Sequence, residues 1–271
     1  MSRAHRAPPA LLLPLTLFLC LGAPPLAASE GASPEEAGLA LAGEARERQI
    51  GFGNFTADQT MLLRNKQGQE SRRKLRVKVL EVEGDGDKSM FVFDQPRDVE
   101  GTALLIYAHK EEADEQWLYL PALKRVKRIS SANRSGSFMG SEFSYEDMGA
   151  QEVEKFTYRY LRDEPCGELM CAVSERFPAD RRSGYQRQVT WHDRDALRLL
   201  KVEYYDRKNA HLKTLTMRDY QIYLDKYWHA GEMAMVNHLT GKSTVLTWSD
   251  YQFGNDLDAG DFSQTGLRRA R

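Results

Sequence analysis

The stretch EQWLYLPALKRVKRISSANRSGSFMGSEFSYEDM, residues 115–148, decides how the rest of the chain has to fold. It opens with an aromatic strand pattern, continues with a basic run and ends in a segment rich in glycine and serine, residues 130–148. That last segment still carries four large apolar side chains: Phe138, Met139, Phe143 and Met148. A soluble protein rarely leaves so much apolar surface on such a segment. We therefore expect residues 130–148 to cover an apolar surface formed elsewhere in the chain.

Strand patterns supply that surface. Residues 71–83 alternate between apolar and charged side chains, as a strand with one face in water does, and GDGD at 84–87 predicts a hairpin turn. Similar signals recur along the chain: 55–65, 88–94, 101–109, 116–121, 153–162, 169–177, 185–192, 197–206, 212–225, 228–239 and 242–253. Strands do not alternate with helices. The prediction is a mainly β fold, a curled antiparallel sheet or incomplete β-barrel of about eleven strands, because so wide a sheet curls.

One helix is expected ahead of the strands, at residues 33–52. Ser33 suits the position that caps a helix, and Pro34 suits its first turn. Gly51 suits its end, and parts of 140–155 also have helical signals. We expect these helices to pack on the concave face of the sheet.

The N-terminus has the pattern of a secretory signal peptide. Arg3 and Arg6 precede an apolar run at 10–22, which is shorter than the roughly 20 residues that span a bilayer. Small residues lead up to Ala28. We expect residues 1–28 to be removed on export, leaving a single domain of residues 29–271.

Two cysteines, Cys166 and Cys171, follow the expected signal peptide. A close pair in an exported chain suggests a disulfide that staples a hairpin. A redox or metal role would call for a C-x-x-C spacing or a neighbouring histidine, and neither is present.

The sequence predicts no catalytic residue, no metal site and no cofactor. No H-E-x-x-H is present, and GSFMG at 136–140 lacks the G-x-S-x-G spacing of a nucleophile elbow. A formal net charge of −1 and the export pattern argue against a nucleic-acid partner. We interpret the basic run at 124–128 as an edge strand, where Lys and Arg discourage aggregation. An anionic head group or an acidic partner protein is the alternative.

Three motifs extend across nearly the whole expected mature chain: QWLYLP at 116–121 followed by KRV at 124–126, SEFSYED at 141–147, and DAGDFS at 258–263. Together they resemble the outer-membrane lipoprotein-sorting protein family, the LolA-like proteins, in the branch associated with MMPL/RND transporters. The resemblance implies a curled, incomplete barrel whose apolar concave face is closed by helices. It also implies a lid held by an arginine, which no motif places in this sequence.

The function implied by the resemblance is that of a non-enzymatic carrier in the periplasm. Its partners would be a lipid or lipoprotein acyl chain and an inner-membrane RND/MMPL-type transporter, and we expect a monomer. The candidate residues that line the apolar cavity and its lid are Phe91, Phe93, Leu105, Trp117, Tyr119, Phe138, Met139, Phe143 and Met148. The alternative is a non-enzymatic adaptor in envelope assembly, with a filled core in place of a cavity.

Overall fold

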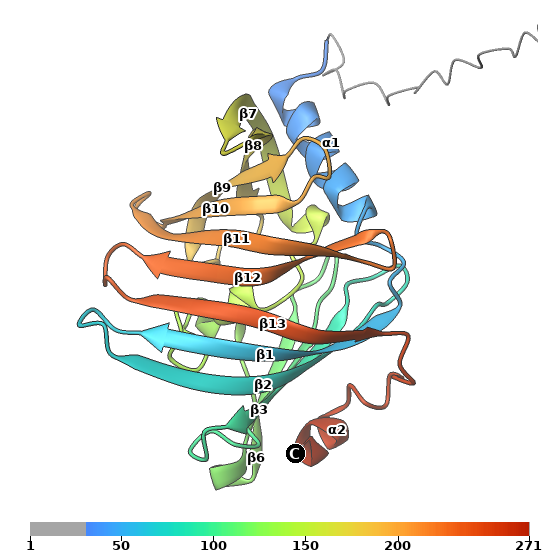
Figure 1. Cartoon of the computed structure of the whole chain (residues 1–271), viewed down its shortest axis with the longest axis vertical. Helices are drawn as coiled ribbons and strands as arrows, with labels where there is room; N and C mark the ends of the chain where they lie inside the picture. The colour runs from blue at the N-terminus through green and yellow to red at the C-terminus, as the bar shows by residue number, and fades with distance from the viewer. Residues whose placement is uncertain (1–30, 271) are drawn as a thin grey trace, which may run out of the picture. The chain divides into compact units, whose positions relative to one another are not determined.

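An antiparallel sheet of thirteen strands forms most of the structure (Figure 1). The computed structural model describes residues 31–270, so the expected signal segment lies outside the described residues. The strands are β1 (Asn54–Arg64), β2 (Glu70–Leu80), β3 (Lys88–Gln95), β4 (Ala103–Tyr107), β5 (Glu115–Leu120), β6 (Arg125–Arg128), β7 (Phe156–Cys166), β8 (Leu169–Pro178), β9 (Tyr185–Asp193), β10 (Leu199–Asp206), β11 (His211–Tyr223), β12 (Tyr227–Asn237) and β13 (Ser243–Phe253). The predicted fold class is confirmed, although the count of about eleven strands was too low.

The sheet is open, and its strands run in the order β6-β5-β4-β3-β2-β1-β13-β12-β11-β10-β9-β8-β7. Neighbours in the sheet are also neighbours in the chain, except where β1 pairs with β13, which places Met61 opposite Leu246. Strands β6 and β7 are therefore the two edges, although they follow each other in the sequence. The basic run is thus an edge strand, as predicted, and residues 129–155 join one edge of the sheet to the other.

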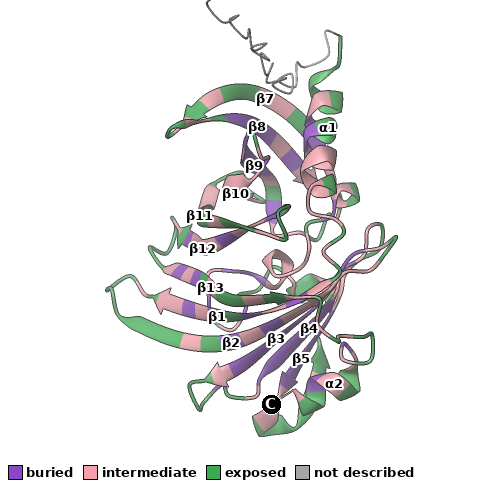
Figure 2. Ribbon diagram, turned by 45° about the vertical axis from the view of Figure 1, so that its right-hand side comes forward, coloured by how far each residue is buried: buried purple, intermediate pink, exposed green. Residues whose placement is uncertain are grey.

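Figure 2 shows the two ends of the sheet curving toward the same side, which we call the inner face. Irregularities in the strands accompany this curl. The pairing of β1 with β13 shifts between Thr56 and Asp58, and that of β10 with β9 shifts between Leu199 and Lys201. A bulge bends a strand and increases its twist, so these shifts favour a curled sheet over a flat one.

Helix α1 (Pro34–Glu47) begins where the sequence predicts and ends earlier than residue 52. The Ser33 hydroxyl accepts a hydrogen bond from the Glu36 backbone N–H at 3.2 Å, and the Glu36 carboxylate accepts one from the Ser33 backbone N–H at 2.8 Å. Together they form a capping box. Gly38 lets the helix pack closely on β7, since a Cβ there would lie 2.7 Å from the backbone N of Tyr160. Leu41 is buried against Ala172 of β8, so α1 covers this end of the inner face.

The centre of the inner face is covered without an α-helix. Residues 130–148 contain only short 3-10 turns, η2 (Ser131–Asn133) and η3 (Tyr145–Asp147). Two further 3-10 turns, η1 (Pro121–Leu123) and η4 (Val153–Lys155), lie outside this segment. The expectation that helices cover the concave face therefore holds only next to β7 and β8.

Strands β3 to β5 are apolar on both faces because both faces are covered. Phe91 and Leu104 face the cluster on the inner face, whereas Leu105 faces outward. On the outer side lies the short helix α2 (Gln264–Arg269), with Phe262 and Leu267 fully buried against the sheet. The sequence pattern alone did not distinguish the two faces here, because each has its own apolar cover.

The β7–β8 hairpin is stapled by a disulfide between Cys166 and Cys171, whose Cα atoms lie 5.8 Å apart. Cys171 is fully buried among Val173, Val189 and Trp191. In the chain-entropy treatment, closing so short a loop stabilises the fold by roughly 2 kcal/mol.

A buried charge cluster connects α1 to the residue just before β3 and to the crossing segment, our name for residues 129–155. The Arg46 guanidinium lies 3.6 Å from the Asp87 carboxylate and 3.2 Å from that of Glu152. Burial raises the pKa of Asp87 to about 6, with the charge of Arg46 acting in the opposite direction. Burial raises the pKa of Glu152 as well. One guanidinium thus serves two carboxylates that are poorly solvated.

We expect Asp87→Asn to stabilise the protein at pH 7. The pKa of Asp87 rises from 3.8 to about 6 on folding, so ionisation favours the unfolded chain by up to about 3 kcal/mol above pH 6. The advantage of the variant in free energy of unfolding should shrink as the pH falls from 6 to 4. Urea denaturation across this range measures it.

Asp85, in the same turn, is the matched control. A hydrogen bond with His109 is the largest cause that lowers the pKa of Asp85, to about 2. Its ionisation therefore favours the folded state above pH 4, and that gain is lost as the pH falls toward 2. Asp85→Asn should be less stable than wild type at pH 7. If Asp87→Asn were also less stable there, the ion pair with Arg46 would outweigh the cost of burial.

Candidate ligand-binding groove

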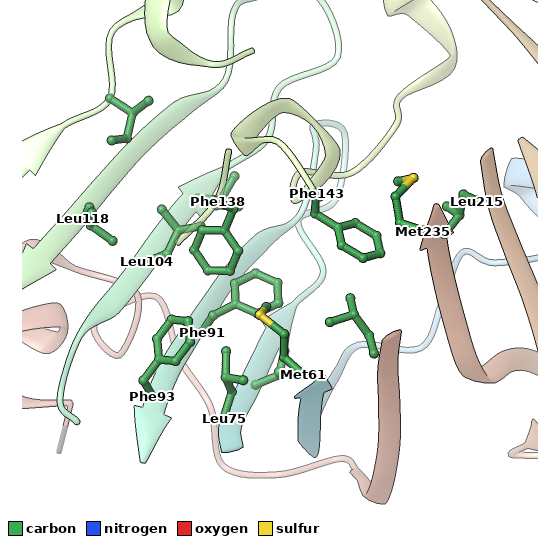
Figure 3. Close-up of a cluster of buried hydrophobic side chains, with 14 of the residues drawn as sticks. Met61, Leu75, Phe91, Phe93, Leu104, Leu118, Phe138, Phe143, Leu215 and Met235 are labelled. Carbon is green, nitrogen blue, oxygen red and sulfur yellow. The ribbon is translucent and has the colours of Figure 1, made fainter. Parts of the chain in front are cut away.

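Apolar side chains from both halves of the sheet converge on the inner face (Figure 3). The buried members of this groove cluster are Met61, Leu75, Val77, Phe91, Phe93, Val99, Leu104, Ile106, Leu118, Ile129, Phe138, Phe143, Tyr185, Val202, Tyr204, Leu215, Met235 and Leu246. They come from β1 to β5, from the loop between β3 and β4, from β9 to β13 and from residues 129–155. Strands distant in the sheet contribute to one cluster because the sheet curls around it.

Residues 130–148, the lid segment, insert two phenylalanines into the groove cluster (Figure 3). Phe138 is 0% exposed, and its ring centroid lies 6.4 Å from that of Phe91 and 5.8 Å from that of Phe93. Phe143 is 3% exposed. The expectation that this segment covers an apolar surface is confirmed.

The tip of the lid segment is a tight loop. The Phe138 backbone N–H donates to the Phe143 carbonyl at 2.7 Å, and the Ser141 hydroxyl donates to the Phe138 carbonyl at 2.7 Å. Between them Met139 and Gly140 have φ angles of 50° and 78°. A residue other than glycine in this region is uncommon, so the surrounding contacts have to hold Met139 in place.

Hydrogen bonds attach the lid segment to both halves of the sheet. On β13 the Thr244 hydroxyl accepts from the Glu142 backbone N–H at 3.0 Å, and on β12 the Asn237 amide donates to the Glu142 carboxylate at 2.7 Å. On β5 the Gln116 amide donates to the Tyr145 carbonyl at 2.8 Å. The cover therefore bridges the curl instead of resting on one side of it.

A buried ion pair is the strongest polar attachment of the lid segment. The Lys213 ammonium on β11 lies 2.6 Å from the Asp147 carboxylate, and both side chains are 5% exposed. Lys213 also donates to the Glu142 carbonyl at 3.0 Å, while the Tyr185 hydroxyl donates to Asp147 at 2.8 Å. The Ser144 hydroxyl donates to Asp147 at 2.7 Å as well. These partners compensate two charges that have lost their water.

An arginine that sequence reasoning missed also contacts the lid segment. Arg73 on β2 is paired with Met61 of β1, and its guanidinium donates a hydrogen bond to the Met139 carbonyl. The guanidinium carbon lies 5.9 Å from the centroid of the Phe93 ring, and burial lowers the pKa of Arg73. The signal was present, because Arg73 has the same parity as the inward-facing Leu75. Because Arg73 is charged, it was not distinguished from the solvent-facing basic residues of β2.

The nine predicted lining residues fall on two faces of the sheet. Six lie in the groove cluster or pack against it: Phe91, Phe93, Phe138, Met139, Phe143 and Met148. Leu105, Trp117 and Tyr119 instead face outward, in the cluster beneath α2. This corrects the expectation that all nine share one surface. Successive side chains of a strand point to opposite faces, and the inward-facing neighbours are Leu104 and Leu118.

Two pockets open along the lid segment. One, of about 470 Å³, lies between the lid segment and β9 to β11, with Phe143 and Lys213 in its lining. The other, of about 650 Å³, lies toward the 111–114 turn and the turn between β8 and β9. Glu146 and Tyr185 line both, and burial raises the pKa of each. Both volumes fall within the range of about 300–1,000 Å³ that is typical of ligand sites.

The chemistry of the site is that of apolar surface under a cover held by polar contacts. Within residues 31–270, no group of three or more His, Cys, Asp or Glu side chains is arranged to hold a metal ion. In the same part of the chain, no helix has the length and apolar character needed to cross a membrane.

Comparisons with known proteins agree with this geometry. A family model described as "Uncharacterized protein" matches residues 85–269. A domain from Vibrio parahaemolyticus designated an outer membrane lipoprotein-sorting protein is 54% identical over 87% of this chain and 100% of its own, with a TM-score of 0.85. A DUF1329 family protein from Desulfovibrio piger is 28% identical over 87% of this chain and 100% of its own, with a TM-score of 0.82.

A LolA superfamily protein from Nitrosomonas europaea shares the fold. It is 20% identical over 84% of this chain and 97% of its own, with a TM-score of 0.68. No curated protein sequence matches the chain.

Replacing Lys213 by Met should lower the free energy of unfolding by about 3–5 kcal/mol, because the Asp147 carboxylate stays buried without its counter-charge. Adding Asp147→Asn should restore much of the loss, since neither charge then remains. Arg64→Met is the control, because it breaks an exposed pair with Glu70 and should cost about 0–1 kcal/mol. Urea denaturation measures all three. A loss in Lys213→Met no larger than that in Arg64→Met would mean that the pair does not hold the lid segment.

Proposed function

Because the chain belongs to the LolA-like family of outer-membrane lipoprotein-sorting proteins, we propose that it is a periplasmic carrier. It binds a lipid or the acyl chain of a lipoprotein in the groove beneath the lid segment and moves it toward the outer membrane. The role is non-enzymatic, in keeping with the family and with a sequence that lacks a catalytic motif. The partner is an inner-membrane transporter of the RND/MMPL type, which the SEFSYED motif at 141–147 suggests.

The observation that carries this proposal is the cover of the groove cluster. Strands of the same sheet enclose most of the cluster, but the side of Phe138 and Phe143 is closed by a loop with 3-10 turns. A loop joined to the sheet by side-chain contacts can move aside without unpairing any strand.

An acyl chain needs such a groove because each methylene costs about 0.8 kcal/mol in water. A chain of a dozen methylenes therefore gains on the order of 10 kcal/mol on burial. When the lid segment moves, Phe91, Phe93 and Leu104 become available to the chain in place of Phe138 and Phe143. The ligand and the lid segment thus compete for one apolar surface, which provides a route for both loading and release.

The adaptor in envelope assembly is a second candidate, favoured by one observation. Phe138 and Met235 are 0% exposed, so the groove is filled when the lid segment is in place. An adaptor would keep this state permanently and use its outer surface to bind another protein. The two candidates differ in whether the lid segment has to move.

The direct test is whether the protein carries lipid. Protein purified from the periplasm without detergent should release a fatty acid, phospholipid or lipoprotein fragment that mass spectrometry detects. The delipidated protein should then bind a fluorescent fatty acid with saturation at one site. The proposal fails if no lipid co-purifies and the probe does not bind.

A disulfide between the lid segment and β13 tests whether the cover moves. The Glu142 backbone N–H donates to the Thr244 hydroxyl at 3.0 Å, so the two positions are in contact, and loss of free thiols on oxidation shows whether cysteines placed there have joined. In the variant Glu142→Cys/Thr244→Cys, oxidation should weaken fatty-acid binding at least tenfold, and reduction should restore it.

The controls are the two single-cysteine variants and the wild type, each with and without reductant, since reduction also opens the Cys166–Cys171 bond. Equal binding by the oxidised and reduced forms of the double variant would favour the adaptor, or a ligand that enters without displacing the lid segment. The fluorescent fatty acid is the probe in every arm.

A further inference from the structure

A further pocket of the inner face lies away from the lid tip, beneath α1. It has a volume of about 260 Å³ and lies between α1 and strands β7 to β12. Ala42 and Ala45 of α1 and Trp228 of β12 give it apolar walls. Ser174, Thr190, His192 and Arg176 of β8 and β9 give it a polar floor. We call it the Arg176 pocket.

Arg176 is a buried cation held by neutral groups. Its side chain donates to the Gln188 amide oxygen at 2.8 Å and to that of Gln151 at 3.5 Å, and its guanidinium carbon lies 4.4 Å from the centroid of the Phe156 ring. It is 8% exposed, and within residues 31–270 no carboxylate forms an ion pair with it at 4.0 Å or less. The charge of Asp147 acts on it from farther away, but Asp147 is already paired with Lys213.

The two other arginines that line this pocket are neutralised. Arg198 lies 2.7 Å from the Asp193 carboxylate, and Arg46 pairs with Asp87 and Glu152. Buried charges in proteins are normally paired, because removing an ion from water is costly. A buried guanidinium without a carboxylate partner, at the floor of a pocket, should therefore increase the binding affinity of an anion more than that of a neutral molecule.

Besides the Arg176 charge, the pocket contains a polar atom that lacks a hydrogen-bond partner. The Nδ1 atom of His192 is buried and makes no hydrogen bond within the described chain. Burial, followed by the charge of Arg176, lowers the pKa of His192 to about 4, so the ring is neutral at pH 7. A neutral imidazole can donate one hydrogen bond from Nδ1. An anion at Arg176 would give this nitrogen an acceptor.

We propose that the Arg176 pocket binds the anionic group, a carboxylate or a phosphate, of the amphiphile whose alkyl chain occupies the groove. This inference rests on the proposed function, since it presumes an alkyl chain on the inner face. The pocket adjoins the groove, because Leu199 lines the pocket and also packs against the groove cluster. The charged group of the ligand binds at Arg176, and the tail extends under the lid segment.

The test compares ligands with one tail and different ends: dodecanoate, dodecyl phosphate and dodecanol, measured by displacement of a fluorescent probe. Wild type should bind the two anions at least tenfold more tightly than dodecanol, which is the gain expected of a charge-assisted hydrogen bond. Arg176→Gln should abolish this preference and leave the affinity for dodecanol within about twofold. Arg176→Lys, which keeps the charge but not the planar fork, should retain part of it.

Arg187→Gln is the matched control on the neighbouring strand. Arg187 pairs with Glu175 at 3.0 Å and stacks on Tyr205, and it does not line the pocket. It should keep the full preference for anions. Circular dichroism shows whether each variant is folded, and the wild-type comparison needs no variant at all.

Each outcome separates this proposal from the carrier function. Equal affinity of wild type for dodecanol and dodecanoate would overturn the anion site and leave the carrier intact. An equal loss for all three ligands in Arg176→Gln would also overturn it, because it would mark a structural role. Methyl phosphate has no tail, so a shift of the Arg176 side-chain NMR signal on its addition would support the site even if the protein carried no lipid.

The same comparison identifies the source of the anion. A stronger preference for dodecyl phosphate would indicate a phospholipid head group, and one for dodecanoate would indicate a fatty acid. Inorganic phosphate that bound as tightly as dodecyl phosphate would overturn the proposal, since the tail would then contribute nothing.

Discussion

The crossing of the chain from β6 to β7 is the constraint on which the rest of this structure depends. These strands are opposite edges of an open sheet, yet they are consecutive in the sequence. The connecting residues, 129–155, therefore have to pass over one face, and they pass over the inner one. The cover of the groove is thus fixed to the sheet at both ends. In the proposed function, opening is therefore the displacement of a loop that stays attached to the sheet at both ends.

The contacts of the lid segment are of kinds that can be broken at a modest net cost in free energy. Phe138 and Phe143 fill space that alkyl groups of a ligand can also fill, so their loss can be compensated. The pair between Lys213 and Asp147 is specific in geometry, but both charges regain water when it separates. Buried ion pairs add little net stability for that reason. An ion pair that is specific in geometry but adds little net stability suits a cover that opens and closes reversibly.

The positions of most strands could be predicted from the local sequence. Which face of the sheet a side chain lies on could be predicted only where one face of the strand is exposed to solvent. Alternation in β2 and the GDGD turn predicted the β2–β3 hairpin, and Ser33 and Pro34 predicted the start of α1. Trp117 was a candidate for the cavity lining but faces outward, and the sequence left its face open because β5 is apolar on both sides and its outer cover, α2, comes from the far end of the chain. Arg73 was missed because its charge suggested that it faces solvent, whereas its position in the alternation of β2 places it on the inner face, opposite Met61. Long-range packing decided both positions.

The polarity of the inner face changes from one part of the sheet to another. At β3 and β4 it presents Phe91, Phe93 and Leu104, whereas at β8 it presents Ser174 and Arg176. A core selected for stability alone has no need of buried polar groups at one end, since each has to be satisfied at a cost in solvation. A molecule with an apolar tail and a charged end matches that gradient, whereas a plain hydrocarbon matches only half of it. The distribution of polarity on this face therefore favours an amphiphile with an anionic group over any wholly apolar ligand.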